Sequence, residues 1–433
     1  MTEDFFMILL KIGSRGPQVE LLQSILNRLG YNSGAVDGIF GIRTQNAVRR
    51  FQNAVGLSVD GIVGDDTWAA LLPYIDGYVS HTVVSGDTFW LLSKKYGTTV
   101  AAISAANPTV DPQNLIVGSK ITVPLNINVV PTDVSYGYEL LIRNIDALKK
   151  RYPFISSETA GKSVMGKDIP YIRLGNGKNE VFFNASHHAN EWITSVLIMR
   201  FIENLCKSYV ERSNVSDIPA AEIFAKSTIY IIPMVNPDGV DLVTGWLSRE
   251  SSEYRSAKAI AEKYPDIPFP SGWKANIRGV DLNLNYPAEW DQAKQIKYDL
   301  GFTSPAPRDF VGERPFSEPE TQMTGRFTKE HDFSLTLSYH TQGELIFWKF
   351  LNYFVPDSFE IAQKFADVSR YTLSLTPYES GYAGYKDWFI QEYRRPGYTI
   401  EAGKGVNPLP ISQFAEIYRD NIGLLSLAAV ATT

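Results

Sequence analysis

The chain has 433 residues, of which 44% are hydrophobic and 20% charged, and its formal net charge is -6. These values are ordinary for a globular protein of two to four domains, since one domain takes roughly 100–200 residues. The acidic balance argues against a general nucleic-acid binder, which needs an excess of Lys and Arg to neutralise phosphates. Cys206 is the only cysteine, so no intrachain disulfide can form.

The N-terminus begins Met-Thr-Glu-Asp and continues with a short apolar run from Phe5 to Leu10. A secretory signal has a basic start and a longer apolar segment, and a membrane span needs ~20 apolar residues. Neither pattern is present in the sequence. We therefore expect a cytoplasmic protein that has no signal peptide and no membrane association.

The first segment, residues 1–77, has the pattern of a small helical domain. One helix face is apolar over Val19, Leu22, Ile25, Leu26 and Leu29. A turn is then repeated, Asp37-Gly38-Ile39-Phe40-Gly41 and Asp60-Gly61-Ile62-Val63-Gly64, and each copy leads into a helix. A Thr or a nearby Asp is the expected helix cap. The whole segment resembles the three-helix peptidoglycan-binding domain of wall hydrolases.

The second segment, residues 78–126, predicts a strand–helix–helix–strand unit. Ser85-Gly86-Asp87-Thr88 is a turn that caps a helix through Tyr96, and a second helix runs from Val100 to Ala106. The run from Lys120 to Pro124 closes the unit as a strand. The unit resembles a LysM domain, which binds the N-acetylglucosamine-containing glycan of peptidoglycan or chitin. Residues 127–136 have no apolar periodicity and are expected to form a linker.

Residues 137–433 alternate helical and β-rich runs, which predicts an α/β domain with a central mixed sheet. The expected helices are Leu140 to Arg151 and Ile193 to Tyr209. The expected strands are Val181 to Ala185, Thr228 to Met234, Phe333 to Tyr339 and Tyr398 to Ile400.

Polar residues follow several of these strands. His188 and Glu191 come after one strand, and His340 and Glu401 end two others. Open α/β sheets bind ligands at the carboxyl ends of their strands. Two imidazoles and a carboxylate form a common catalytic zinc set, and a further carboxylate can act as base. Spacing alone also fits a structural histidine and an ion-paired acid.

Five motifs in order, SHHANEWIT, NPDG, GVDLN, SYHTQG and YTIEAG, resemble the zinc carboxypeptidase family over nearly all of residues 136–433. The resemblance implies that one Zn2+ is held by His188, Glu191 and His340, with Glu401 as general base. It implies that His187 is not a ligand, because the family's metal histidine lies three positions before the Glu.

The same resemblance implies roles for residues around the metal. Asp281 matches the acid that orients the first histidine ligand, and Arg278 matches the arginine that stabilises the oxyanion. Tyr378 matches the mobile tyrosine that closes over substrate, with Tyr382 as an alternative. Asn283 matches the first residue of the Asn-Arg pair that binds a terminal carboxylate.

The sequence departs from a carboxypeptidase in that pair, because Leu284 follows Asn283. Leucine cannot replace the bidentate guanidinium, so ordinary C-terminal trimming is not expected. Lys386 matches a position that lines the family's specificity pocket. A cation there predicts an acidic substrate, although a solvated surface lysine is an equal alternative.

The order of the three segments resembles peptidoglycan peptidases of sporulating bacilli that hydrolyse the γ-D-glutamyl bond to meso-diaminopimelate in stem peptides. The expected partners are therefore peptidoglycan glycan and stem peptides, and the expected compartment is the mother cell. Two alternatives stay open: a metallocarboxypeptidase acting on ordinary peptides, and a non-catalytic wall-binding protein.

Overall fold

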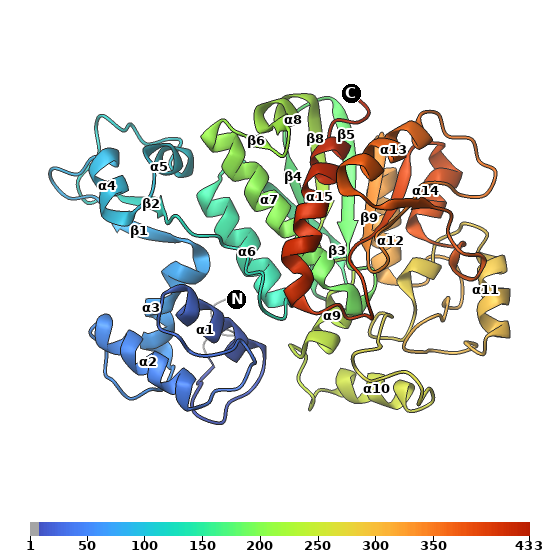
Figure 1. Cartoon of the computed structure of the whole chain (residues 1–433), viewed down its shortest axis with the longest axis horizontal. Coiled ribbons are helices and arrows are strands. Elements are labelled where there is room, and N and C mark those ends of the chain that lie inside the picture. Colours follow the sequence, from blue (N-terminus) through green and yellow to red (C-terminus); the bar gives the residue numbers. More distant parts are fainter. Residues whose placement is uncertain (1–7) are drawn as a thin grey trace. The chain divides into compact units, whose positions relative to one another are not determined.

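The computed structural model describes residues 8–433, so part of the apolar run that begins at Phe5 lies outside it. None of the helices in the described part has both the length and the apolar composition that crossing a membrane requires. The chain forms two compact units (Figure 1). The first comprises residues up to Ser156 together with Cys206–Glu211, and the second comprises Ser157–Leu205 and Arg212–Thr433.

The first unit begins with the three expected helices, α1 (Pro17–Arg28), α2 (Ile42–Ala54) and α3 (Asp65–Asp76). The repeated turns are held by two buried glutamines in the same way. The Gln23 amide donates to Asp37 and Thr44, and the Gln52 amide donates to Asp60 and Thr67.

These contacts correct the expected capping. The helices α2 and α3 begin after Gly41 and Gly64, and neither has a side-chain cap. The two threonines instead accept hydrogen bonds from the glutamines inside the domain. A buried amide that satisfies several turn groups fixes the turn geometry, which is the reason for the sequence repeat.

The next module has the expected strand–helix–helix–strand order. Strands β1 (Tyr78–Thr82) and β2 (Lys120–Pro124) pair antiparallel, and between them lie α4 (Phe89–Tyr96) and α5 (Val100–Ala106). The hydroxyl of Thr88 accepts a hydrogen bond from the Leu91 N–H and caps α4, which confirms the predicted capping turn.

The expected linker, residues 127–136, has irregular backbone but is not a solvated spacer. Its side chains Val129, Val130, Val134 and Tyr136 are buried. The Ser135 N–H donates to the Glu20 carboxylate at 2.7 Å, within the same unit. The helix α6 (Tyr138–Arg151) follows and also belongs to the first unit.

The second unit is built on an eight-stranded sheet in the order β11-β10-β12-β9-β5-β8-β4-β3. Its central pairs, β8 with β5, β5 with β9 and β9 with β12, are parallel, while β4 and β10 pair antiparallel with their inner neighbours. This is the predicted mixed sheet. The strands are β3 (Ser156–Lys162), β4 (Asp168–Leu174), β5 (Asn179–Ala185), β8 (Ser227–Ile232), β9 (Leu335–His340), β10 (Leu345–Phe347), β11 (Thr372–Ser374) and β12 (Gly397–Glu401).

Helices cover both faces of this sheet. Successive side chains of a strand point to opposite faces, and on β5 the Phe182 ring meets Tyr385 of α14 while the Phe183 ring meets Phe201 of α7. The helices of the second unit are α7 (Ile193–Glu211, of which Cys206–Glu211 belongs to the first unit), α8 (Ala220–Lys226), α9 (Pro237–Thr244), α10 (Ser252–Ala261), α11 (Trp290–Asp299), α12 (Pro319–Lys329), α13 (Ser358–Ser369), α14 (Tyr385–Tyr393) and α15 (Phe414–Ala428). Short elements complete the unit: β6 (Asn214–Val215), β7 (Ile218–Pro219), η1 (Ala189–Glu191), η2 (Leu282–Leu284), η3 (Tyr378–Ser380) and η4 (Ile411–Gln413).

The register of the parallel strands brings three strand ends to one edge of the sheet. Ala185 of β5 pairs with Tyr339 of β9, and His340 of β9 pairs with Glu401 of β12. Paired residues on neighbouring strands point to the same face. The polar residues that the sequence places at separate strand ends therefore meet at a single edge.

Candidate metal centre

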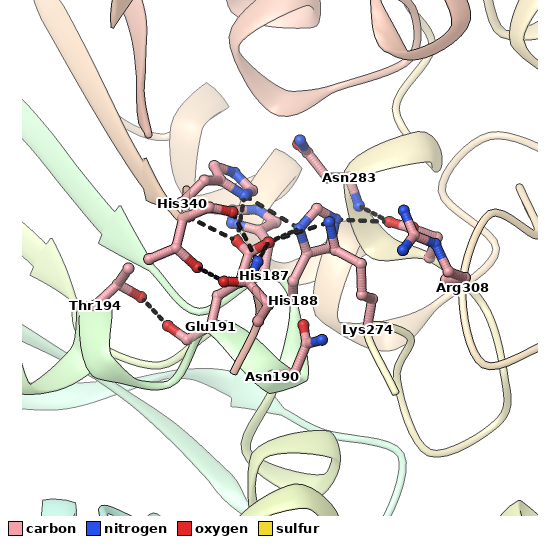
Figure 2. Close-up of polar contacts among 12 residues, drawn as sticks. His187, His188, Asn190, Glu191, Thr194, Lys274, Asn283, Arg308 and His340 are labelled. Carbon is pink, nitrogen blue, oxygen red and sulfur yellow. Dashed lines mark hydrogen bonds and ion pairs between the residues drawn. The ribbon is translucent and has the colours of Figure 1, made fainter. Parts of the chain in front are cut away.

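Three buried side chains converge at this edge and form the metal centre: His188, Glu191 and His340. Their ligand atoms all lie within 4.8 Å of one another. The Nδ1 atom of His188 lies 3.1 Å from Glu191 Oε1, and His340 Nδ1 lies 3.0 Å from Glu191 Oε2 (Figure 2). The two Nδ1 atoms are 3.2 Å apart. The structure thus brings together the three ligands that the sequence resemblance implies.

The donor set fits a zinc ion. The Nε2 atom of His188 lies 2.9 Å from Asp281 Oδ1, and a carboxylate there accepts the Nε2 proton. In the neutral ring the lone pair of His188 Nδ1 then points toward His340 and Glu191. Two imidazole nitrogens and a carboxylate facing one another in a buried site are stabilised by a cation, and His2Glu is a catalytic zinc set. Asp281 therefore lies within hydrogen-bond distance of His188, as the orienting role that the resemblance implies would require.

The electrostatics of the metal centre show how strongly it attracts positive charge. Burial and the Lys274 cation disfavour a charged His188, but the carboxylates of Glu191 and Asp281 outweigh both and raise the pKa of His188 to about 9. Burial alone would raise the pKa of Asp281, yet His188 and Lys274 hold it well below its usual range. Without a metal the centre therefore holds a proton at neutral pH.

The Glu191 carboxylate accepts hydrogen bonds from two loops, one that follows β9 and one that follows β12. Its Oε2 accepts the Thr341 N–H at 3.2 Å, and its Oε1 accepts the Asn407 side-chain N–H at 3.2 Å. Asn407 and Thr341 also bond to each other, at 2.7 and 2.9 Å. Asn407 lies 216 residues from Glu191 along the chain, so no local motif could have indicated it.

His187 lies outside the group of three possible ligands, His188, Glu191 and His340. Its Nε2 lies 2.9 Å from the Tyr286 hydroxyl, and its ring is fully buried on the inner side of the metal centre. Burial and the neighbouring imidazoles lower its pKa well below the usual range, so it stays neutral.

Glu401 lines a cavity beside the metal centre. The cavity has a volume of about 670 Å³, and its polar lining includes Asn190, Lys274, Arg308, Thr341, Glu401 and Asn407. The Glu401 side chain is half-buried at the end of β12. Burial and the nearby Glu191 carboxylate raise the pKa of Glu401 to about 8. A carboxylate with a raised pKa beside a metal centre is suited to proton transfer near neutral pH.

The structure corrects the expectation for Arg278. This residue lies at the outside of a turn in which the Asn276 side chain accepts the N–H groups of residues 278 and 280. Its side chain is 57% exposed, its nearest acid is Glu318 at 3.7 Å, and it does not line the cavity.

A different cation, Lys274, lines the cavity beside Glu191. Its carbonyl accepts the Ala189 N–H at 3.0 Å, which fixes it to η1, and its Nζ lies 3.1 Å from Glu191 Oε1. Burial favours the neutral amine, but Glu191 and Asp281 outweigh it and raise the pKa of Lys274, so it is a cation at neutral pH. In the sequence, Lys274 directly follows Trp273, and this tryptophan is buried in the structure. Its place next to an apolar residue was the only sequence feature that could have indicated an inward-facing lysine.

Lys386 does not line the cavity, contrary to the sequence-based expectation. It is only 4% exposed, and its Nζ donates to Asp387 Oδ1 at 2.5 Å and to the Lys349 carbonyl at 2.9 Å. It is therefore neither a solvated surface lysine nor a free cation for an acidic substrate. The sequence could not show this, because the orientation of α14 decides where residue 386 points.

The side chains of the remaining predicted substrate contacts, Asn283 and Tyr378, bond to protein groups other than the three possible ligands. The Asn283 side-chain oxygen accepts the Tyr385 N–H at 3.1 Å. The Tyr378 hydroxyl accepts a hydrogen bond from Gln292 at 3.0 Å, and neither Tyr378 nor Tyr382 lines the cavity. A substrate contact by either tyrosine stays a prediction.

The mixed sheet and the His-Glu-His centre define a zinc-dependent metallopeptidase class, and comparison with known families agrees. Residues 141–423 match the family model described as zinc carboxypeptidase. Residues 15–71 match a peptidoglycan binding domain, and residues 81–124 match a LysM domain. The chain belongs to the zinc carboxypeptidase family.

Individual relatives give the same picture. The chain is 39% identical over 292 residues to gamma-D-glutamyl-L-diamino acid endopeptidase 1 of Lysinibacillus sphaericus, covering 67% of this chain and 71% of that protein. It is 24% identical over 202 residues to carboxypeptidase B of Bos taurus, covering 45% and 42%. The crystal structure of thrombin activatable fibrinolysis inhibitor shares the fold, with a TM-score of 0.54 at 17% identity over 70% of this chain and 79% of that one.

Proposed function

We propose that this enzyme hydrolyses the γ-D-glutamyl bond to a diamino acid, meso-diaminopimelate, in peptidoglycan stem peptides. The observation that carries the proposal is the 39% identity over 292 residues to an enzyme named gamma-D-glutamyl-L-diamino acid endopeptidase 1, together with the His188, Glu191 and His340 cluster. Two features of the second unit support it: the absence of a carboxypeptidase anchor at residue 284, and the cationic residues of the cavity.

Leu284 is built into the protein interior. Its side chain is 6% exposed and belongs to an apolar cluster with Trp290, Ala293 and Val311. An arginine at this position would leave an unpaired charge in that cluster, which is costly. The bidentate contact to a terminal carboxylate at residue 284 is therefore missing, which favours an enzyme that does not trim ordinary C-termini.

The arrangement of side chains suits hydrolysis by an activated water. His188, Glu191 and His340 would hold a zinc ion, and this ion would supply the Lewis acidity that lowers the pKa of water and polarises a carbonyl. Glu401 then accepts the proton of the attacking water and passes it to the leaving nitrogen. The Lys274 ammonium is placed to stabilise the negative charge that develops on the carbonyl oxygen.

The first unit supplies wall binding. Its two modules match families named for peptidoglycan binding and LysM, so peptidoglycan is the partner. We propose that they hold the enzyme on the glycan while the second unit cuts the attached stem peptides, which raises the local substrate concentration.

We also propose that the enzyme acts inside the cell, in the mother cell of a sporulating bacterium. The single cysteine supports this, because the fold does not depend on an oxidising compartment. Fractionation of sporulating cells tests the point: we expect the protein in the mother-cell cytoplasm, and recovery from the culture medium would contradict the proposal.

The function is tested with purified protein and the peptide L-Ala-γ-D-Glu-meso-diaminopimelate, with and without a zinc chelator. A conventional peptide with a free C-terminus and its amidated form serve as controls. We expect chelator-sensitive cleavage of the γ-D-glutamyl bond alone. Cleavage of the conventional peptide alone would instead identify a metallocarboxypeptidase, and no cleavage by zinc-loaded protein would favour a non-catalytic wall-binding role.

A further inference from the structure

The cavity beside the metal centre has a second cation that the proposed chemistry does not use. Arg308 lines this cavity together with Lys274 and Glu401. Figure 2 shows Arg308 and Lys274 on loops beside His188 and Glu191. No motif in the sequence singled out Arg308, since it lies in the irregular segment between α11 and α12.

The backbone around Arg308 is anchored on both sides to segments that form the centre. The Pro307 carbonyl accepts the N–H of Lys274 at 2.7 Å and the N–H of Ala275 at 2.9 Å. The Asp309 N–H donates to Asp281 Oδ2 at 3.2 Å, and Asp281 is the acid that holds His188. Arg308 thus stands between two residues whose positions are fixed relative to the metal ligands.

The Arg308 guanidinium is held by one ion pair, and some of its hydrogen-bond donors have no partner in the described part of the chain. Its Nε donates to Asp309 Oδ2 at 2.6 Å, and the other oxygen of Asp309 accepts from the buried Lys297 at 2.6 Å. The Arg308 side chain is still 45% exposed. Across residues 8–433, neither Nη atom of Arg308 has a hydrogen-bond partner. An anchored guanidinium with free Nη donors at a cavity wall is suited to binding a carboxylate.

We infer that Arg308 binds a carboxylate of the substrate next to the scissile bond, and so supplies from a different loop the guanidinium that Leu284 lacks. This inference rests on the proposed function, because a γ-D-glutamyl–diaminopimelate bond has free carboxylates close to it on both residues. One is the α-carboxylate of the D-glutamate, and the other is the diaminopimelate carboxylate on the carbon that carries the scissile nitrogen. Arg308 is therefore a specificity residue.

Three peptides separate the two sources: the free tripeptide, its D-isoglutamine form with the glutamyl α-carboxylate amidated, and a form amidated on the diamino acid. Each is assayed with zinc-loaded wild type, Arg308→Gln and Arg308→Lys. We expect Arg308→Gln to lower kcat/KM for the free tripeptide by about 10- to 100-fold, the usual range for a charged hydrogen-bond pair. Arg308→Lys keeps the charge but loses the fork, so its loss should be smaller.

We expect the losses of kcat/KM caused by Arg308→Gln and by amidation of the bound carboxylate not to be additive. For one amidated peptide, wild type should already show the 10- to 100-fold loss, and Arg308→Gln should add little to it. The peptide that behaves in this way identifies the bound carboxylate. The matched control is Arg419→Gln, an arginine on α15 that is 67% exposed and paired with Asp420, which should leave all three rates unchanged.

A binding measurement separates recognition from catalysis. In a Glu401→Gln background, which removes the proposed base, calorimetric Kd values for the three peptides should show the same pattern with and without Arg308→Gln. Equal losses on all three peptides, or no loss on any, would overturn the inference. If wild type itself fails to cleave the free tripeptide, the proposed function fails instead. Should Arg308→Gln not fold, Arg308→Lys and the amidated peptides with wild type still decide the question.

Discussion

Replacing Lys274 with methionine tests the proposal that Lys274, and not Arg278, stabilises the oxyanion. The substitution keeps an unbranched apolar side chain, one atom shorter, and removes the charge, at a site where the lysine is only 17% exposed. Glu191 keeps the Thr341 N–H and the Asn407 amide as hydrogen-bond donors. We therefore expect the carboxylate to stay in place and the protein to bind one zinc per chain.

We expect Lys274→Met to weaken binding of the transition state and to leave binding of the substrate largely unchanged. Removing one donor to a developing oxyanion costs about 100- to 1,000-fold in kcat, or about 2.7–4 kcal/mol. KM should change much less, because the charge on the carbonyl oxygen appears only after the substrate is bound. Lys274→Arg should recover part of the rate, since it restores a cation.

The assay is steady-state cleavage of the γ-D-glutamyl tripeptide, with zinc content and melting temperature measured on the same samples. Arg278→Gln is the matched control, because that guanidinium is largely exposed and lies on Glu318. We expect it to retain near wild-type kcat. The assignment of Lys274 is refuted if Lys274→Met keeps more than half of the wild-type kcat, or if Arg278→Gln shows the large loss instead.

Two further predictions concern the base and the metal. Glu401→Gln should lower kcat by about 100- to 10,000-fold while zinc stays bound, because the proton acceptor is lost; full activity with zinc present would exclude Glu401 as the base. In the metal-free protein the pKa of His188 is raised to about 9, so zinc must displace a proton at pH 7. Zinc affinity should therefore rise about tenfold per pH unit from pH 7 and level off above pH 9, and calorimetry in buffers of different ionisation enthalpy should detect the released proton. A flat affinity profile from pH 7 to pH 9 would contradict this assignment.

Local sequence determined most of the architecture of this protein. Helical and β-rich runs predicted α6, α7 and the four parallel strands at the centre of the sheet, because apolar periodicity and strand-forming residues act over a few neighbouring positions. Polar residues directly after those strands indicated His188, Glu191, His340 and Glu401. Residues that follow parallel strands can be predicted to lie close together, because the carboxyl ends of these strands meet at one edge of the sheet.

Only the tertiary structure decided which polar side chains surround the metal centre. Lys274, Arg308 and Asn407 lie on irregular segments that reach the strand ends through backbone hydrogen bonds to distant residues, such as Lys274 O with the Ala189 N–H. Such long-range contacts leave no periodicity in the sequence. In the same way, the turn around Asn276 directs Arg278 outward, and the packing of α14 buries Lys386 against Asp387. The amino-acid sequence sets which functional groups are available, whereas the fold decides which of their side chains face the metal centre.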